Sequence, residues 1–290
     1  MTISEKFSNF CDKIEMDDQT ISNIIYRYHQ ITKRINKDYW DIDSDTYHSL
    51  YVGSYGRGTE IYASDIDMLV QLPYSIYQKF NNYSGNKQSA FLQDVKKTIE
   101  KTYSTSFLKG DGQIISLPFT DGINFEVLPA FVNNDDSFTY ANTNNGGEWR
   151  VTDPRAEIKA INDMNSKCNY NLKRLCKMAR AWKHNNDVDI SGILIDVLAY
   201  NFMDNWIYKD KSFLYYDYMT RDFFDYVRKE EKSQYKWKVM GSNRYIYCYG
   251  SFQNKADKAY KQALDAIEYE GKQQEYSANL KWREIYGNKF

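Results

Sequence analysis

Two aspartates stand at the start of an apolar run, DIDMLVQLP, where a strand is expected. Asp65 and Asp67 are separated by one residue. Because side chains on a strand alternate between its two faces, both carboxylates project from the same side. Like charges this close raise each other's pKa unless a cation lies between them, and oxygen ligands favour a hard divalent ion such as Mg²⁺. The spacing therefore predicts a metal site, with a solvated strand end as the alternative.

A third carboxylate, Glu126, is the acid within a second apolar run, INFEVLPAF. On a strand it shares one face with Asn124 and Leu128. Two metals held by three carboxylates activate an attacking hydroxyl and stabilise a leaving pyrophosphate, so Glu126 could complete the site. The alternative role for Glu126 is a buried ion pair with a Lys or Arg. Asp121 is a rival third acid, but its place before Gly122 is better explained by a turn.

Gly53 and Ser54 lie a dozen residues ahead of the aspartates, in the segment GSYGRG. A turn with little side-chain bulk, opening a short helix with free N–H groups and a hydroxyl, can hold the terminal phosphates of a nucleoside triphosphate. The turn and the acids together indicate one site, with the triphosphate at one end and its metals at the other.

The remaining pattern predicts the elements that must position these groups. Apolar residues at helical spacing predict helices within 3–37 and 89–103. Strands are expected in the run closed by Pro73, in QIISLPF and in INFEVLPAF, the last two joined by a hairpin turn at Asp121-Gly122. Residues 80–89 and 133–148 are rich in Asn, Gly or Ser and are expected to be loops.

The character of the chain changes near residue 150. Asp153 is a plausible N-cap and Pro154 a plausible first helical residue. Helices are then expected at 171–186, 191–206, 217–232 and 254–282. The sequence thus predicts a mixed α/β half followed by a helical half.

Composition limits the classes of partner. The 290 residues include 38 basic and 39 acidic ones, so no overall field draws the molecule to nucleic acid, and any basic surface must be local. The four cysteines form no C-x-x-C pair, which fits reduced thiols. No apolar run approaches the roughly 20 residues of a membrane helix, and MTISEKFSNFCDK lacks a signal-peptide core. We expect a cytoplasmic protein with no membrane contact and no obligate long nucleic acid.

Several segments carry a resemblance to a known family. GSYGRGTEIYASDIDMLV resembles the G-S-x(n)-D-x-D signature of polymerase β-like nucleotidyltransferases, and INFEVLPAF resembles their third-carboxylate strand. The wider pattern resembles the bacterial relatives of cyclic GMP-AMP synthase, the cGAS/DncV-like nucleotidyltransferases of the SMODS type. It is carried by GGEWRVTDPRAEI, NLKRLCKMARAWK, SGILIDVLAY and AIEYEGKQQEYSANLKWREIYGNKF. The D-x-D element is specific for the superfamily, and the W-R-x-T-D-P and C-terminal segments point to the subfamily.

The resemblance implies an α+β fold. Residues 1–150 would hold an N-terminal helix and a polymerase β-like nucleotidyltransferase core with a mixed sheet, and residues 151–290 an α-helical lobe, with the active site in the cleft between them. It implies a synthase that uses two Mg²⁺ ions, or Mn²⁺ in their place, to join nucleoside triphosphates into a cyclic oligonucleotide, with a cyclic dinucleotide expected. A separate effector protein would read this second messenger in anti-phage defence.

The resemblance also assigns roles by position. Asp65, Asp67 and Glu126 would be catalytic and bind the metals, and Gly53 and Ser54 would bind phosphate. Lys177, with Arg180 or Lys173 as neighbours, would meet the triphosphate from the helical lobe, near Ser191, and Thr152 and Asp153 would lie near the nucleobase lid.

Some of these residues have competing explanations. Lys177 and Arg180 lie three apart on a helix, which suits phosphate contact and plain solvation equally. Asp153 fits a helix cap, although a carboxylate could also accept hydrogen bonds from N1 and N2 of guanine, a pattern that adenine does not present. Glu126 replaces the Asp common in the family, and its extra methylene could shift a metal that demands octahedral geometry and slow the enzyme.

Two other functions remain open at this point. One is nucleotidyl transfer to another acceptor, such as an antibiotic hydroxyl or an RNA end. The helical half and the W-R-x-T-D-P segment argue against the first acceptor, and the nearly neutral charge argues against a long RNA. The other is an inactive nucleotide-binding homologue, for which Glu126 is the sequence hint.

Overall fold

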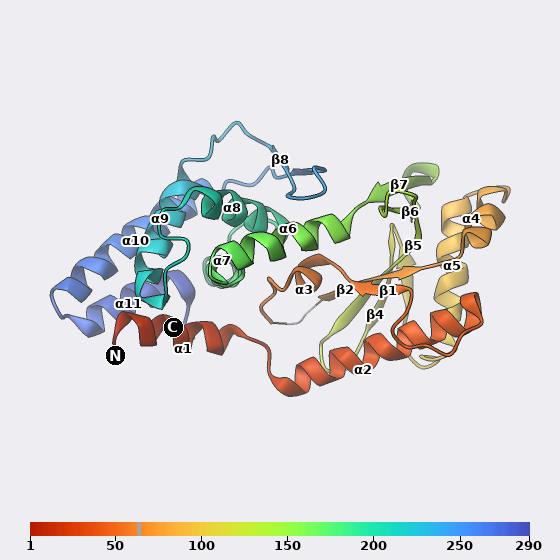
Figure 1. Ribbon diagram of the computed structural model, residues 1–290, viewed down its shortest axis with the longest axis horizontal. Coiled ribbons are helices and arrows are strands. Elements are labelled where there is room, and N and C mark those ends of the chain that lie inside the picture. The colour runs from red at the N-terminus through yellow and green to blue at the C-terminus, as the bar shows by residue number, and fades with distance from the viewer. Residues whose placement is uncertain (63–64) are drawn as a thin grey trace. The chain divides into compact units, whose positions relative to one another are not determined.

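The structure is a computed structural model that describes residues 1–62 and 65–290. Figure 1 labels its main elements. The helices are α1 Ile3–Ile14, α2 Asp18–Ile35, α3 Gly53–Arg57, α4 Tyr74–Asn81, α5 Lys87–Glu100, α6 Pro154–Lys167, α7 Asn171–Asn186, α8 Gly192–Asn205, α9 Tyr216–Arg228, α10 Gln253–Gly271 and α11 Glu275–Tyr286. The strands are β1 Ser49–Tyr51, β2 Asp65–Gln71, β3 Lys109–Asp111, β4 Ile114–Pro118, β5 Asn124–Val132, β6 Phe138–Asn142, β7 Glu148–Thr152, β8 Lys236–Lys238 and β9 Tyr245–Tyr247.

A mixed sheet forms the centre of the α/β part. Its order is β1-β2-β5-β4-β3, with β6 pairing to β5 and β7 to β6. The β2–β5 pair is parallel, and the other pairs are antiparallel. The expected hairpin is confirmed as β4–β5, where the Phe119 amide donates to the Ile123 carbonyl over 2.8 Å. The α+β fold class is therefore confirmed.

The alternation of β2 sorts apolar and acidic side chains onto opposite faces of the sheet. Ile66, Met68 and Val70 are buried in a core built with α2 and α5. Leu69, on the other face, belongs to a smaller cluster with Val52, Ala130 and Phe138. Asp65 and Asp67 therefore share the face that the two helices do not cover.

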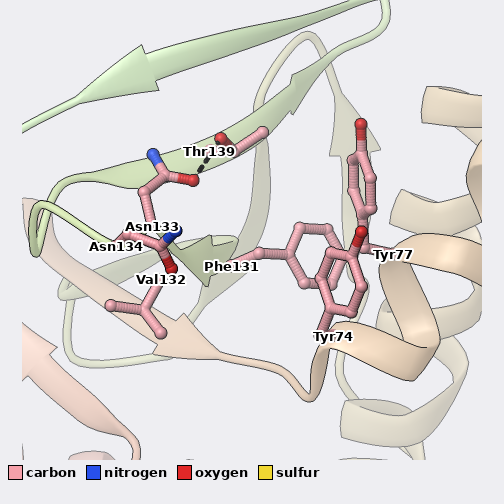
Figure 2. A pocket seen from close by; sticks show the side chains of 7 residues that line it. All are labelled: Tyr74, Tyr77, Phe131, Val132, Asn133, Asn134 and Thr139. Atoms are coloured by element: carbon pink, nitrogen blue, oxygen red, sulfur yellow. Dashed lines mark hydrogen bonds between the residues drawn. The ribbon is translucent and has the colours of Figure 1, made fainter.

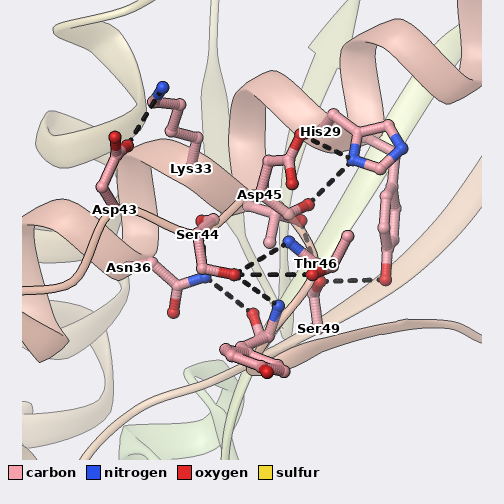
Figure 3. A network of polar contacts seen from close by, with 11 residues as sticks. His29, Lys33, Asn36, Asp43, Ser44, Asp45, Thr46 and Ser49 are labelled. Atoms are coloured by element: carbon pink, nitrogen blue, oxygen red, sulfur yellow. Dashed lines mark hydrogen bonds and ion pairs between the residues drawn. The ribbon is translucent and has the colours of Figure 1, made fainter.

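The segment that leads into β1 is fixed by hydrogen bonds to α2 and to the π-helical turn Asn36–Trp40 that follows it (Figure 3). Asn36 donates from Nδ2 to the carbonyls of Ser44 and Tyr47 over 2.9 and 2.8 Å. His29 Nδ1 lies 2.9 Å from the Asp45 carbonyl oxygen. Because β1 pairs with β2 and is separated from Gly53 by Val52 alone, this network sets the approach of the chain to the predicted phosphate turn.

One predicted loop is wrong. Residues 133–148 were expected to be an exposed loop, but residues 138–142 form β6, in which Phe138 and Ala141 are buried. The Asn, Asp and Gly residues serve the turns on either side: the Asn133 amide donates to the Ser137 carbonyl, and Asn144–Gly146 form a short 3₁₀ turn. Burial of two side chains outweighs the local preference for turns.

Two compact units differ from the expected division at residue 150. One unit is helical and comprises Met1–Glu15, Gly58–Tyr62 and Lys159–Phe290. The other is the α/β unit, comprising Met16–Arg57 and Ala63–Ile158. Helix α1 joins the helical unit because its apolar face, with Phe7 and Phe10, is buried in that unit's core.

The second half also differs from expectation in two details. The helix expected at 254–282 is interrupted at residues 272–274, where Gln273 has φ 58°, giving α10 and α11. The short hairpin of β8 and β9 was not expected. Each of its strands has three residues, too few for a pattern to be read.

No helix in the described part of the chain combines the length and the apolar character needed to cross a membrane. The four cysteines are free, and Cys11, Cys168 and Cys176 are buried. Burial raises the pKa of Cys11 to about 12, so that thiol stays protonated and inert at neutral pH.

The docking of α1 predicts a large effect from one substitution. Phe7 is fully buried, with its ring 5.2 Å from that of Trp282 and 5.1 Å from that of Phe290. We expect Phe7→Ala to lower the free energy of unfolding by about 3–5 kcal/mol, measured by urea denaturation. The matched control is Phe107→Ala, because Phe107 is 71% exposed and should change stability by less than about 0.5 kcal/mol. Equal effects of the two substitutions would contradict this account of α1.

Candidate active site

Parallel pairing of β2 with β5 brings two of the predicted acids together. Asp67 lies opposite Glu126 in the register, and Asp65 lies opposite Asn124. The Asp67 and Glu126 carboxyl groups share a hydrogen bond. Asn124 Nδ2 donates to Asp65 Oδ1 over 3.2 Å. Three carboxylates that span 61 positions of the sequence, from Asp65 to Glu126, thus stand on one face of two adjacent strands.

Gly53 lies directly against this group. Its φ is 60°, and a Cβ built on it would lie 1.8 Å from Asp67 Oδ2. The Val52 amide also donates to the Asp67 carbonyl over 2.9 Å. Only glycine both adopts this backbone conformation readily and leaves room for the carboxylate. The predicted phosphate turn and the predicted metal ligand are therefore in contact, and Ser54 is the next residue, in the first turn of α3.

Burial and neighbouring charges raise the pKa of Asp67 and of Glu126. Burial is the main cause of the raised Asp67 pKa, which the nearby Arg57 guanidinium opposes and the Asp65 charge reinforces. Burial, followed by the charges of Asp67 and Asp65, raises the pKa of Glu126 to about 7. The shared hydrogen bond is consistent with a protonated Glu126 that donates to an ionised Asp67.

The donor set has the chemistry of a site for hard divalent cations. All three side chains offer carboxylate oxygens, which suit Mg²⁺ and Mn²⁺. A cation beside them would favour the charged forms and lower both raised pKa values. Across residues 1–62 and 65–290, however, no three His, Cys, Asp or Glu side chains are grouped closely enough to be identified as a metal centre. The metal assignment of Asp65, Asp67 and Glu126 therefore rests on donor chemistry and stays a prediction.

Arg57 is a residue of this site that the sequence reasoning missed. It ends α3, is buried, and its Nη1 lies 3.5 Å from Glu157 Oε2. Its charge is also close enough to Asp67 to oppose the rise in that residue's pKa. A signal was present, since GSYGRG places an arginine four residues after Gly53, within one helical turn of the phosphate segment.

The two residues assigned to the nucleobase lid have structural roles at a strand end and a helix start. Thr152 ends β7, opposite Phe138. Asp153 Oδ1 accepts a hydrogen bond from the Ala156 amide over 3.0 Å, which is the geometry of a helix N-cap. The cap explanation of Asp153 is confirmed, whereas a role in base choice stays a prediction. The rival acid Asp121 pairs with Arg27, whose Nη2 lies 2.8 Å from Asp121 Oδ2, so it is accounted for by that ion pair.

In the helical unit, α7 presents two of the predicted cations on one side. Lys173 and Lys177 are one turn apart, and Lys177 forms an ion pair with Glu15. Lys173 Nζ lies so close to Gly58 that a Cβ there would approach it to 2.9 Å. Burial lowers the pKa of Lys173, and the Glu60 carboxylate opposes this. The two lysines thus form a cluster of positive charge with Glu15 and Glu60 as counter-ions.

Arg180 does not belong to that cluster of accessible cations. It is buried, and its guanidinium donates to Asp196 through Nη1 over 2.6 Å and through Nη2 over 3.0 Å. The same two nitrogens also donate to the carbonyls of Cys176 and Gly192. We therefore assign Arg180 a structural role in place of the predicted triphosphate contact.

Ser191 is an N-cap of α8, because its Oγ accepts a hydrogen bond from the Leu194 amide over 3.3 Å. This cap hydrogen bond does not test the predicted position of Ser191 near the triphosphate, which stays a prediction. The structure thus brings together Gly53, Asp65, Asp67 and Glu126 in the α/β unit, and Lys173 and Lys177 in the helical unit.

A cavity of about 540 Å³ in the α/β unit is separate from these acids (Figure 2). Its wall includes Tyr74, Tyr77 and Phe131, and also Asn133 and Thr139, where Thr139 Oγ1 donates to Asn133 Oδ1 over 2.9 Å. Phe131 lies five residues beyond Glu126 on β5, or about 17 Å along a strand. It is not the predicted active site.

Comparisons with known proteins agree with the resemblance in the sequence. The family described as Second Messenger Oligonucleotide or Dinucleotide Synthetase domain matches residues 1–165. A probable cyclic nucleotide synthase of Bacillus cereus (strain VD146) is 24% identical over 173 residues, which span 57% of this chain and 51% of that protein. The alignment thus spans about half the length of that curated relative.

Two further similarities extend over essentially the whole chain. The cyclic AMP-AMP-AMP synthase of Acinetobacter sp. (strain ATCC 27244 / 9458) is 20% identical across 100% of this chain and 86% of its own length. The structure of CdnC of Escherichia coli MS115-1 with ATP matches with a TM-score of 0.68 at 13% identity, covering 99% of this chain and 98% of that one. The shared fold is therefore not limited to the α/β unit.

The raised pKa of Glu126 predicts how stability depends on pH without metal. Its folded pKa of about 7 exceeds the ordinary 4.5, so the fold binds a proton that the unfolded chain releases in this interval. The contribution to stability is full below about pH 4.5 and is lost as pH rises to about 7. In EDTA, Glu126→Gln should therefore flatten the decline in the free energy of unfolding between about pH 5 and about pH 8, measured with urea. The control Glu148→Gln should keep the decline, because ion pairing lowers the pKa of Glu148.

The structural role of Arg180 predicts a contrast with Lys177. Arg180→Met would leave the Asp196 carboxylate buried without its cation, although the Thr59 hydroxyl would still donate to its Oδ2 over 3.0 Å. We expect the free energy of unfolding to fall by about 3–5 kcal/mol. Lys177→Met breaks a pair whose Glu15 is half exposed and should cost less than about 1 kcal/mol. A small effect of Arg180→Met in urea unfolding would refute the structural assignment.

Proposed function

Because the chain belongs to the Second Messenger Oligonucleotide or Dinucleotide Synthetase family, we propose that it joins nucleoside triphosphates into a cyclic oligonucleotide. The observation that carries the proposal is the contact of Gly53 with Asp67, beside Glu126. It brings a turn suited to phosphate and a set of carboxylates suited to divalent cations into one site. A ribose hydroxyl attacks the α-phosphorus, a phosphodiester bond forms, the bond to pyrophosphate breaks, and pyrophosphate leaves. A second such step closes the ring.

The side chains of the α/β unit would divide this work. Asp65, Asp67 and Glu126 would hold two Mg²⁺ ions, or Mn²⁺, which supply a Lewis acid for the attacking hydroxyl and for the leaving pyrophosphate. Glu126 lies opposite Asp67, and a bound cation would favour its ionised form, so we propose that its carboxylate accepts the proton of the attacking hydroxyl. Gly53 and Ser54 would contact the phosphates through main-chain N–H groups and the serine hydroxyl. The positive charge of Arg57 would stabilise the ionised form of Asp67.

Lys173 and Lys177 are the proposed cationic contacts for the triphosphate. Their position one turn apart suits two neighbouring phosphates, and each has an acidic counter-ion that a phosphate could replace. Arg180 is left out of this set. Thr152, Asp153 and Ser191 stay as proposed neighbours of the nucleotide.

Adenine is the base that we propose first, because the Acinetobacter relative is named a cyclic AMP-AMP-AMP synthase and CdnC was solved with ATP. We would propose guanine as a second substrate base only if Asp153 contacts the base. The N-cap hydrogen bond of Asp153 already explains an aspartate at this position without such a contact. We propose a ring of two nucleotides, read by a separate effector protein in anti-phage defence; a ring of three is the product named in that relative.

The test is a product assay. The protein is incubated with the four nucleoside triphosphates, one radiolabelled at a time, and with Mg²⁺ or Mn²⁺, then treated with phosphatase. We expect a phosphatase-resistant cyclic species, whose labels and mass give the bases and the ring size. Asp67→Asn should lower the rate at least about 100-fold, because electrostatic stabilisation of the transition state is removed. The control Asp121→Asn removes a carboxylate paired with Arg27 and should keep the wild-type rate.

Other outcomes decide between functions. Label transferred to an added RNA end or to an aminoglycoside hydroxyl would replace the synthase proposal by transfer to another acceptor. Triphosphate binding with no product under either metal would support the inactive homologue. If Glu126→Asp then restored product formation, the loss of activity would be attributed to the extra methylene of Glu126. Wild-type product in Asp67→Asn would overturn the site.

A further inference from the structure

The hairpin of β8 and β9 exposes an unusual face. Its outer side chains are Tyr245 and Tyr247 on β9 and Lys236 and Lys238 on β8, paired Lys236 to Tyr247 and Lys238 to Tyr245. Tyr235 and Tyr249 flank the hairpin. We call Tyr235, Lys236, Lys238, Tyr245, Tyr247 and Tyr249 the tyrosine ribbon. Its four tyrosines are between 48% and 83% exposed, whereas tyrosine side chains in folded proteins are ordinarily at least half buried.

Three of the four rings of the ribbon are aligned, those of Tyr235, Tyr247 and Tyr249. The Tyr235 ring lies 6.2 Å from that of Tyr247 with planes 22° apart, and 6.1 Å from that of Tyr249 with planes 10° apart. Alternate residues on a strand are about 6.6–6.8 Å apart, so Tyr245, Tyr247 and Tyr249 repeat along one side. The ribbon therefore presents several aromatic faces in nearly the same orientation.

The positive charge of the ribbon is placed among these rings. Lys236 Nζ lies 5.0 Å and Lys238 Nζ 5.9 Å from the centre of the Tyr245 ring. The chain as a whole has a net charge of −1, so this is a local basic surface. Two ammonium groups beside exposed rings match a ligand that alternates planar aromatic groups with negative charges.

The inner side of the hairpin holds the ribbon in place. Trp237 and Ile246 are buried in the core of the helical unit, and the Trp237 indole donates to Glu230 Oε2 over 3.0 Å. The Cys248 amide donates to the Tyr235 carbonyl over 3.0 Å, which continues the pairing to the flanking tyrosines. At the far end, a Cβ on Gly250 would lie 2.3 Å from the Asp189 carbonyl oxygen, so the chain there packs tightly. The outer rings thus stand on a fixed base and lose little freedom when a ligand covers them.

We propose that the tyrosine ribbon binds single-stranded nucleic acid, with bases stacking on the tyrosines and phosphates meeting Lys236 and Lys238. Base stacking on exposed aromatic side chains beside a basic groove is the usual means of binding single strands without sequence preference. A duplex hides its base faces and would meet only the two lysines. The inference uses no residue of the active site and does not depend on the proposed synthase activity.

Binding can be measured by fluorescence anisotropy on the full chain. The probes are fluorescein-labelled single-stranded RNA and DNA of about 12 nucleotides, a length within known site sizes, and the corresponding duplexes. Excess ATP and EDTA are present, so that the labelled strand cannot be held at the nucleotide site or consumed. We expect saturable binding of the single strands and weaker binding of the duplexes.

Two sets of variants test separately the stacking of bases on the tyrosines and the contact of phosphates with the lysines. Tyr249→Ala should weaken binding about tenfold, the scale of one base–ring stack, whereas Tyr276→Ala, at a residue 76% exposed on α11, should not. Replacing Lys236 and Lys238 by Gln should reduce the slope of log affinity against log salt by about 0.7 for each phosphate that a lysine no longer neutralises. Circular dichroism checks that the variants keep the wild-type helix content.

The proposal would be overturned by no binding of single strands at tens of micromolar protein, or by equal affinity in the Tyr249→Ala and Tyr276→Ala variants. Binding to anionic phosphatidylserine vesicles without binding to the oligonucleotides would also overturn it, and would make the ribbon a membrane-surface contact. Tighter binding of the duplex than of the single strand would also refute stacking as the basis of recognition.

Discussion

The parallel pairing of β2 with β5 places the Asp67 and Glu126 carboxyl groups beside each other in a partly buried position, and the candidate site is organised around that contact. Two acids so close cannot both ionise freely, and burial penalises their charge further. The surrounding chain accommodates them with a glycine that leaves room for one carboxylate, a buried arginine that favours its charge, and an apolar packing on the opposite face of the strand. A site of this kind is tuned to accept positive charge.

The helical unit resolves its charges differently. Arg180 and Asp196 neutralise each other completely in the interior, with four guanidinium hydrogen bonds given to protein acceptors. Lys173 and Lys177, on the same helix, are partly exposed. Their acidic neighbours are Glu60, which precedes β2 in the chain, and Glu15, at the C-terminal end of α1. Spacing on a helix therefore does not distinguish a structural cation from a cation available to a ligand. The acidic partner distinguishes them, and the partner of Arg180 is the buried Asp196 on α8.

The sequence was most informative where the determining interactions are local. The alternation in DIDMLVQLP and INFEVLPAF was enough to predict two strands and the shared face of their acids, and the family match confirms the resemblance carried by those segments. Arg57 was missed because its partner, Glu157, lies 100 residues later. Residues 138–142 were missed because the burial of Phe138 depends on strands far along the chain, while the Asn residues around it favour turns locally. The roles of individual site residues in catalysis remain predictions, since position and charge do not reveal turnover.

The assembly of the helical unit from three separate stretches has a consequence for how the protein is made. Phe7 is translated 275 residues ahead of its ring partner Trp282. At about 5–20 residues per second, the interval between them is on the order of tens of seconds. During that time α1 has an apolar face with no core to enter, while the α/β unit, whose residues end at Ile158, is already complete. The order of synthesis therefore leaves the apolar face of α1 without its core until residues 159–290 have been made, after the α/β unit.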